Sequence, residues 1–252
     1  MRLLYLGNNR LGAQILPWLV EQGEEIVGLV LHEEGKRKNG AELLAAAKLP
    51  PERIFPGVAL KEPATLEAIQ ALGAEMALSI LFDYILRPPF LSLFPKRVVN
   101  LHPSLLPWNR GQYPNVWSII EGTPAGTTLH YIDAGIDTGE ILAQREIAIE
   151  PVDTGESLYR KLEQASFDLF RECWPALKAG TLPPLAQSRE AGTVHRARDV
   201  DAIDRIDPER SYTGRELINI LRARTFPPYR GAYMLEGGRR IELRLGLEYG
   251  KE

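Results

Sequence analysis

Residues 2–31 read RLLYLGNNRLGAQILPWLVEQGEEIVGLVL, and this stretch decides the fold class. Residues 3–6 form a short apolar run, 11–22 carry apolar side chains at helical spacing, and 26–31 form a second apolar run. Strands that are apolar on both faces are typical of parallel sheets covered by helices. The order strand, glycine turn, helix, strand therefore predicts a βαβ unit.

The alternation of helical and strand patterns continues along the chain. Helices are predicted at 40–48 and 64–72, and short strands are predicted near Ile54, at 76–81 and at 98–102. Strands that alternate with helices predict an α/β fold, here a Rossmann-like and mostly parallel sheet flanked by helices.

Two further strands, at 126–133 and 140–149, are expected around a turn rich in glycine and aspartate. A long amphipathic helix should follow, because Asp153 with Glu156 resembles a capping signature and apolar residues come next at helical spacing. Glycine and proline residues then end this region, and we place a domain boundary near residue 185.

The C-terminal region shows a helix signal and a hairpin signal. Thr213 with Glu216 predicts the capped start of a helix, and alternating apolar residues within 233–248 predict two strands around a glycine pair. We expect residues 1–185 to form the main domain. Residues 186–252 should form a small α+β appendage that ends in a hairpin and leans on that domain or on a second subunit.

Composition excludes several classes of protein. With 44% hydrophobic and 25% charged residues the chain can bury a full core, so a disordered chain, a disulfide miniprotein and a fibrous repeat are excluded. The net charge of -3 gives no global basic field for nucleic acid. The single cysteine, Cys173, permits neither an intrachain disulfide nor a cysteine-built zinc site. The start of the chain shows no secretory signal, and no apolar run reaches the ~20 residues that span a bilayer. We therefore expect a cytoplasmic protein without membrane contact.

The glycine turn after the first strand carries no complete nucleotide motif. Residues 7–12 read GNNRLG, and Ala13 and Gln14 stand where a P-loop requires Lys and Ser or Thr. Asn9 stands where the dinucleotide fingerprint requires a glycine. The turn still places backbone N–H groups at a helix N-terminus, where an anion can bind. A plain turn whose asparagines cap the helix fits equally well.

A second stretch, NLHPSLLP at 100–107, carries polar side chains at the end of a strand. Asn100 and His102 are two residues apart and point to the same side of a strand. Pro103 interrupts the hydrogen-bond ladder, which places the pair at the carboxyl end, where open α/β sheets bind ligands. A single histidine is more often structural, but this setting favours chemistry. The remaining histidines have no comparable setting: His32, His130 and His195.

Asp137 lies in the sequence DAGIDTG at 133–139. Two glycines and two acids in seven residues are typical of a hairpin loop, and that interpretation stays open. In the alternative, the Asp137 carboxylate approaches His102, favours its imidazolium form and orients the ring.

An amide, an imidazole and a carboxylate together suit the attack of an amine on an acyl carbon. The Asn100 amide and the imidazolium would stabilise the developing oxyanion, each by ~3 kcal/mol. The imidazole could also relay the proton that the amine loses. Neither a serine nor a cysteine nucleophile is required if a cofactor carries the acyl group.

These residues form part of a longer pattern that resembles a known family. The pattern continues through Arg110-Gly111, Pro114 and the sequence GTTLH at 126–130 into 133–139. It resembles the formyltransferase family that uses 10-formyltetrahydrofolate. The resemblance is specific over residues 76–145.

The resemblance implies a fold and roles for individual residues. The stretch to about residue 185 is similar to the family's Rossmann-like catalytic domain. Asn100, His102 and Asp137 match the catalytic asparagine, histidine and aspartate, and we predict no metal site. The donor would be 10-formyltetrahydrofolate as a co-substrate.

In this family the pterin ring of the donor is held largely by backbone groups upstream of the asparagine. The matching segment is Tyr84, Ile85 and Leu86, and the loop that carries Asp133 and Ile136 would close the other side. Without the resemblance, residues 84–86 are interpreted as a strand-to-loop segment that packs on the core.

Family members formylate methionyl-tRNA, glycinamide ribonucleotide or a nucleotide-linked amino sugar. The sequence LINILRARTFPPY at 217–229 is similar to sugar N-formyltransferases, so we expect a nucleotide-linked amino sugar as the acceptor. Its polar and phosphate groups would contact Asn8, Asn9 and Arg110, although each of these could equally be a solvated turn residue.

Two alternatives stay open. The same chemistry could act on methionyl-tRNA, although the tRNA enzymes generally carry a larger, basic C-terminal domain. The chain could also be a folate- or nucleotide-binding module without catalysis, although such a module needs no complete trio. The apolar face of the C-terminal hairpin could serve a homodimer contact, or the hairpin could equally cover the edge of the main sheet.

Overall fold

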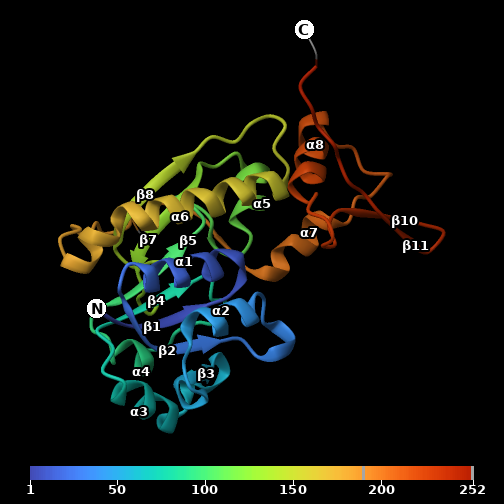
Figure 1. Ribbon diagram of the computed structural model, residues 1–252. Coiled ribbons are helices and arrows are strands. Elements are labelled where there is room, and N and C mark those ends of the chain that lie inside the picture. Colours follow the sequence, from blue (N-terminus) through green and yellow to red (C-terminus); the bar gives the residue numbers. More distant parts are fainter. Residues whose placement is uncertain (189–190, 251–252) are drawn as a thin grey trace. The chain divides into compact units, whose positions relative to one another are not determined.

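The computed structural model describes residues 1–188 and 191–250 of the chain (Figure 1). Packing divides the chain into two units, each built from segments that are separated in sequence. Neither unit is one continuous stretch of sequence, so the boundary near residue 185 stays a prediction. The first unit comprises Met1–His102, Thr128–Gln144 and Ser166–Gln187, and the second comprises Pro103–Thr127, Arg145–Ala165 and Ser188–Glu252.

A seven-stranded sheet in the order β3-β2-β1-β4-β5-β7-β8 forms the centre of the fold. The pairs among β1, β2, β3, β4 and β5 are parallel, and β7 pairs with β5 in the antiparallel direction. The expectation of a mostly parallel, Rossmann-like sheet is therefore confirmed. The strands are β1 (Arg2–Gly7), β2 (Glu25–Leu31), β3 (Ile54–Pro56), β4 (Met76–Ile80), β5 (Val98–His102), β7 (Ala125–Tyr131) and β8 (Ile141–Ile147).

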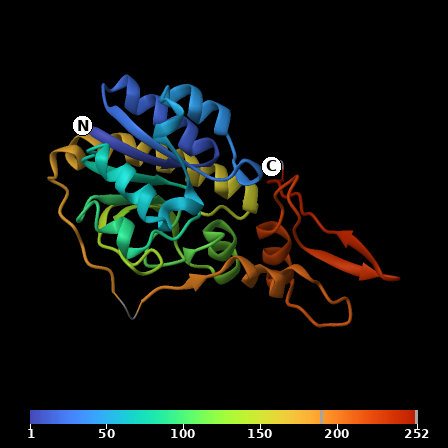
Figure 2. The same cartoon turned by 90° about the horizontal axis from the view of Figure 1, so that it is seen from below.

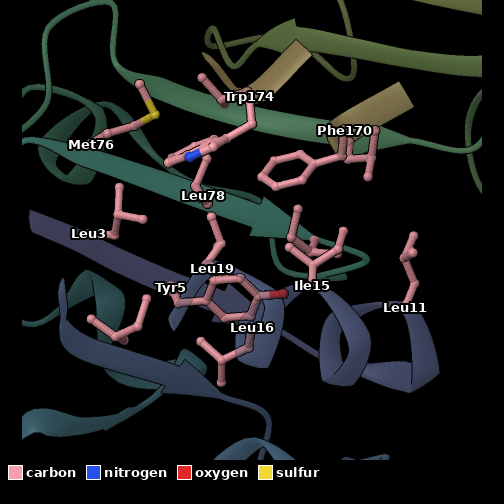
Figure 3. Close-up of a cluster of buried hydrophobic side chains, with 14 of the residues drawn as sticks. Leu3, Tyr5, Leu11, Ile15, Leu16, Leu19, Met76, Leu78, Phe170 and Trp174 are labelled. Carbon is pink, nitrogen blue, oxygen red and sulfur yellow. The ribbon is translucent and has the colours of Figure 1, made fainter. Parts of the chain in front are cut away.

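Helices cover both faces of this sheet. Successive side chains of a strand point to opposite faces, so Leu3 and Tyr5 join one apolar cluster, and Leu4 and Leu6 join the other. Figure 3 shows the first cluster, in which side chains of α1 and α6 meet those of β1 and β4. The second cluster lies under α3 and α4. The helices named here are α1 (Asn9–Glu21), α2 (Gly40–Ala47), α3 (Pro63–Ala71), α4 (Pro88–Leu91) and α6 (Gly155–Ala179).

Short 3-10 turns connect several of these elements. They are η1 (Glu34–Lys36), η2 (Pro51–Arg53), η3 (Gly57–Lys61) and η4 (Ala197–Val200). The first of them belongs to the loop that leaves β2, and this loop contributes to a cavity considered below.

The second unit contains small elements around α5 and α8, which pack on each other. The predicted cap of α8 is confirmed, since the Thr213 hydroxyl accepts the N–H of Glu216 at 3.1 Å. The hairpin is confirmed too, and its antiparallel strands are the red arrows in Figure 2. Its second strand ends at Glu242, so the alternating leucines beyond that residue are not part of a strand. The elements are β6 (Arg110–Gly111), α5 (Pro114–Glu121), β9 (Val194–His195), α7 (Asp201–Asp204), α8 (Gly214–Ala223), β10 (Tyr233–Glu236) and β11 (Arg239–Glu242).

The long helix α6 is capped one residue later than the sequence suggested. The Thr154 hydroxyl accepts the N–H of Ser157, and the Ser157 hydroxyl accepts the N–H of Thr154. The prediction that Asp153 and Glu156 form the cap is wrong, because the Asp153 carboxylate instead binds the Glu150 N–H and Lys161. Within the described ranges, no helix combines the length and the apolar composition that crossing a membrane requires.

A buried carboxylate fastens the last turns of α6 within the first unit. Glu24 accepts hydrogen bonds from the N-terminal amine at 2.8 Å, the Trp174 indole at 3.1 Å and Lys178 at 2.7 Å. Its side chain is 1% exposed. Burial raises the pKa of Glu24, but the hydrogen bonds from Lys178, the N-terminal amine and Trp174 outweigh burial and bring the pKa below its usual value.

We expect Glu24→Gln to lower the free energy of unfolding by about 2 kcal/mol near pH 7, because an amide cannot pair with two cations. Since the folded-state pKa is lowered, the stabilisation is fully present above the pKa of the unfolded carboxyl and is lost as the pH falls through the folded-state value. The difference between wild type and variant should therefore shrink below about pH 4.

Urea unfolding near neutral pH and near pH 3 measures both effects. Glu21→Gln, at an exposed position of α1, is the matched control. A difference that is the same at both pH values would contradict this account of Glu24.

Candidate active site

The polar residues at the end of β5 face residues of β7 across an antiparallel pair. The register places Asn100 opposite His130 and His102 opposite Thr128. Residues two apart on one strand, and residues directly opposite on its neighbour, share a face of the sheet. Asn100, His102 and His130 therefore point to the same side, within the first unit.

The Asp137 carboxylate lies among these three side chains. One oxygen, Oδ2, is 3.7 Å from His102 Nε2, and the other, Oδ1, is 3.6 Å from His130 Nε2 and 3.5 Å from Asn100 Nδ2. The structure thus brings together Asn100, His102 and Asp137, as expected. The approach to His102 has ion-pair length rather than hydrogen-bond length. Contacts between groups that move protons often shorten when a reactant binds.

His130 fixes the orientation of the Asn100 amide. Its Nδ1 lies 2.8 Å from the carbonyl oxygen of Tyr131, which can only accept, so Nδ1 carries a proton. In the neutral ring Nε2 is then an acceptor, and it lies 3.1 Å from Asn100 Nδ2. One N–H of the amide is held by His130, and the other is directed towards Asp137 and the space beside it.

The loop that carries Asp137 is held in an uncommon backbone conformation. Asp137 has φ +50°, in the left-handed region that few residues other than glycine adopt. Asp133 stabilises the turn by accepting the Gly135 N–H at 2.9 Å and the Thr138 hydroxyl at 2.6 Å. A Cβ at Gly139 would lie 1.8 Å from the carbonyl oxygen of Tyr131, so only glycine allows this close approach.

Gln187 fastens this loop from a distant part of the sequence. Its side-chain N–H groups donate to the carbonyl oxygens of Asp137 at 2.9 Å and Gly139 at 2.7 Å. Both hydrogens of one amide nitrogen thus bind the loop backbone on either side of Thr138. This contact fixes where the Asp137 carboxylate can reach.

Sequence reasoning missed His130 and Gln187. His130 was interpreted as a histidine without a functional setting, and the structure corrects this, since the imidazole contacts both Asn100 and Asp137. The cross-strand register could have revealed His130 once β7 was paired with β5. No local sequence pattern marks Gln187, because its side chain binds main-chain oxygens of a distant loop. Gly139, one of its partners, lies 48 residues earlier in the chain.

The segment expected to hold the pterin leaves β4 and precedes α4. Ile85 is 67% exposed and Leu86 is buried. Among the described residues, the main-chain N–H and C=O groups of 84–86 make no hydrogen bonds to other main-chain groups, so they can serve a ligand. On the loop after β7, the Ile136 side chain is also exposed and Asp133 is used within the turn.

Tyr84 makes a side-chain hydrogen bond in addition to its packing contacts. The hydroxyl donates a short hydrogen bond to the Glu33 carboxylate. Burial, together with this hydrogen bond, raises the pKa of Tyr84 to about 12, and the same bond lowers the pKa of Glu33. The phenol therefore stays protonated and holds the loop after β2 beside the loop after β4.

The residues expected to bind the acceptor lie in both units. Asn8 is buried after β1, and its side-chain oxygen accepts the N–H of Lys38 at 2.7 Å, so it does not cap α1. Asn9 begins α1 with φ +63°. Arg110 belongs to the second unit, where its buried guanidinium donates to the carbonyl oxygen of Ser188 at 3.3 Å.

No set of three or more metal-binding side chains is arranged as a metal site in the described part of the chain. The chemistry available at the cluster of Asn100, His102, His130 and Asp137 is that of amide and imidazole donors beside a carboxylate. Such a set can stabilise an oxyanion and move a proton.

We expect Gln187→Glu to loosen the Asp137 loop, because a carboxylate oxygen would face two carbonyl oxygens in place of an N–H donor. Amide hydrogen exchange of residues 133–139 should accelerate about tenfold, which corresponds to a loss of about 1.4 kcal/mol. Gln70→Glu, at an exposed position of α3, makes the same chemical change away from the loop. Unchanged exchange in the Gln187 variant would show that the side chain does not hold the loop.

Comparisons with known proteins found two family models, curated relatives and solved structures that are similar to this chain. Residues 11–172 match the family model described as formyl transferase, and residues 199–249 match the one described as N-formyltransferase dimerization C-terminal domain. The dTDP-4-amino-4,6-dideoxyglucose formyltransferase of Mycobacterium tuberculosis is 37% identical over 153 residues. That match covers 60% of this chain and 65% of the relative, so it spans less than two thirds of the relative's length.

Two solved structures are similar over larger shares of their chains. A sugar N-formyltransferase from a Shewanella species has a TM-score of 0.85 and 26% identity, and covers 100% of this chain and 99% of its own. A formyltransferase from Anoxybacillus kamchatkensis has a TM-score of 0.59 and 30% identity, and covers 80% of this chain and 89% of its own. The second was solved with UDP-4,6-dideoxy-4-formamido-L-AltNAc and tetrahydrofolate bound.

Proposed function

The chain belongs to the formyl transferase family, as its motifs predicted, and we propose that it transfers a formyl group from 10-formyltetrahydrofolate to the amine of a nucleotide-linked amino sugar. The observation that carries this proposal is the meeting of Asn100, His102 and Asp137 on one face of the sheet. Two relatives support the acceptor: the Mycobacterium tuberculosis enzyme is a dTDP-4-amino-4,6-dideoxyglucose formyltransferase, and the Anoxybacillus kamchatkensis formyltransferase was solved with a UDP-linked 4-formamido sugar bound. We therefore place the formyl group on a 4-amino-4,6-dideoxy sugar.

Asn100 and His102 stabilise the charge that develops during transfer. The acceptor nitrogen attacks the formyl carbon, and the formyl oxygen becomes an oxyanion. The second N–H of the Asn100 amide turns from Asp137 to this oxygen, while His130 keeps the amide in place. His102 lies two residues further along β5 on the same face of the sheet, so its ring N–H can donate a hydrogen bond to the same oxygen.

Asp137 assists the transfer of the proton that the amine must lose. Its carboxylate lies 3.7 Å from His102 Nε2 and favours the protonated imidazole. As the new N–C bond forms, the bond from the formyl carbon to N10 of the folate breaks. The proton passes from the acceptor amine to N10 through this polar cluster, so formamide and tetrahydrofolate are released without net change of charge.

The donor lies along residues 84–86. The main-chain groups of this segment suit the hydrogen-bonding edge of a pterin, and Ile85 and Ile136 offer apolar surface to its ring. Asn8, Asn9 and Arg110 stay candidates for the acceptor's polar and phosphate groups. We propose that the enzyme acts as a homodimer, because residues 199–249 match a dimerization domain. We also propose that it acts in the cytoplasm, where a chain with a single cysteine fits the reducing conditions.

We expect Asp137→Asn and His102→Ala each to lower kcat by about 100-fold or more, because each removes a group that acts in the transition state. Circular dichroism melts should show folded variants, since both side chains lie at a strand end or in a loop. Glu52→Gln, an exposed change, is the control. A variant of either residue that keeps kcat within about threefold of wild type would remove that residue from the mechanism.

The acceptor is tested by incubating the protein with 10-formyltetrahydrofolate and one amine at a time. The amines are a dTDP-linked and a UDP-linked 4-amino-4,6-dideoxy sugar, methionyl-tRNA and glycinamide ribonucleotide, and release of tetrahydrofolate is the readout. We expect kcat/KM for a nucleotide sugar to exceed that for methionyl-tRNA by about 100-fold, a difference of about 2.7 kcal/mol. A preference for methionyl-tRNA would overturn the proposed acceptor. Thermal stabilisation by folate without turnover of any amine would indicate a binding module instead.

A further inference from the structure

A cavity of about 360 Å³ lies beside the ends of three neighbouring strands of the first unit. Asn8 follows β1, the loop from His32 to Lys38 follows β2, and Asp83 and Tyr84 follow β4. The carboxyl ends of β1 and β4 flank the point where an open α/β sheet changes direction, which is where such sheets bind ligands. The cluster around Asn100 belongs to β5 and β7, so this cavity is a separate place on the same edge.

His32 is buried in this cavity without a hydrogen bond to its ring. The residue is 3% exposed, and neither Nδ1 nor Nε2 has a hydrogen-bond partner among the described residues. Its ring is wedged between Phe82 and Tyr84, with centroids 4.9 Å and 4.8 Å away. A buried ring whose nitrogens lack hydrogen-bond partners is destabilising, and a ligand in the cavity that bonds to the ring would recover that free energy.

The charges around His32 favour an anion. Lys36 and Lys38 line the cavity from the loop after β2. The Glu33 carboxylate on the same loop is bound by the Tyr84 hydroxyl, and the Asp83 carboxylate lies 3.7 Å from His32 Nε2. The residues that line the cavity thus include two lysines and one carboxylate, Asp83. The Glu33 carboxylate stays charged, but it does not line the cavity.

The start of α1 adds to this field. Asn8 is the residue at the cap position of α1, but its side-chain oxygen accepts the Lys38 N–H and makes no capping hydrogen bond to the helix. The first N–H groups of a helix carry a partial positive charge and bind phosphates or carboxylates. The Asn8 contact instead ties the lysine loop to the start of α1.

We propose that this cavity is an oxyanion subsite in which Lys36, Lys38 and His32 bind a phosphate or carboxylate group of a reactant. The proposal rests on the proposed function, which supplies two sources of such a group. One is the diphosphate of the nucleotide-linked acceptor, and the other is the glutamyl carboxylate of the folate donor. Tyr84 is shared with the segment expected to hold the pterin, so either reactant is within reach of the cavity.

The protonation of the His32 imidazole depends on the charge of a ligand in the cavity. Burial lowers the pKa of His32, the Asp83 and Glu33 carboxylates oppose burial, and Lys36 and Lys38 reinforce it. An oxyanion beside the ring would favour the protonated form, whose two N–H groups can serve Asp83 and the anion together.

Two sets of variants test the proposal by binding rather than turnover. Lys36→Met with Lys38→Met removes both cations while keeping the aliphatic stems, and His32→Phe keeps an aromatic ring without N–H groups. Lys48→Met with Lys61→Met makes the same change in net charge at exposed positions of the same unit. Thermal melts check that each variant is folded.

Isothermal titration calorimetry is carried out with inorganic pyrophosphate, dTDP, UDP, 5-formyltetrahydrofolate and the analogue of that folate without its glutamate. We expect the Lys36/Lys38 variant to bind pyrophosphate about 10- to 100-fold more weakly and His32→Phe about tenfold more weakly, with the control unchanged. If the acceptor supplies the anion, dTDP or UDP follows pyrophosphate. If the donor supplies it, the glutamate-bearing folate loses affinity, and the analogue without glutamate does not.

Equal affinities of wild type and both variants for every probe would overturn the subsite. These measurements use no turnover, so they separate the subsite from the proposed function. An inactive wild type whose pyrophosphate binding depends on Lys36, Lys38 and His32 would retain the subsite and reject formyl transfer. An active wild type whose binding is indifferent to all three residues would retain formyl transfer and reject the subsite.

Discussion

The antiparallel register between β5 and β7 is the constraint on which the candidate active site depends. This pair follows the parallel run of β3, β2, β1, β4 and β5, and it sets Asn100 directly opposite His130. A shift of one residue would turn His130 to the other face of the sheet and leave the Asn100 amide without its acceptor. The apolar residues of both strands oppose such a shift, because Val99, Leu101 and Leu129 are buried in the core. The same packing that stabilises the sheet thus orients the polar cluster.

The second constraint is the backbone of the Asp137 loop. A left-handed residue other than glycine costs about 1–2 kcal/mol, and Asp137 adopts that conformation at the position where its carboxylate is needed. Contacts within the turn to Asp133 and from Gln187 hold it there. The carboxylate is therefore positioned by main-chain geometry rather than by a strong ion pair, which agrees with its distance of 3.7 Å from His102.

Much of the first unit could be predicted from the sequence. Apolar runs gave the strands, and the two-residue spacing of Asn100 and His102 before Pro103 indicated a site at a strand end. Features that depend on the distant course of the chain could not be predicted in this way. His130 becomes informative only when the pairing partner of β5 is known, and Gln187 only when the segment after α6 returns to the loop. The cap of α6 shifted by one residue because the Asp153 carboxylate has other partners, among them Lys161.

The central claim is that the Asn100 amide, held by His130, meets the oxygen of the group being transferred. A crystal structure of the protein with donor and acceptor bound, trapped with the Asp137→Asn variant, measures this directly. We predict the formyl oxygen about 2.7–3.1 Å from Asn100 Nδ2 and the acceptor nitrogen about 3–3.5 Å from the formyl carbon. A formyl oxygen turned away from both Asn100 and His102, with both reactants ordered in the site, would contradict the account.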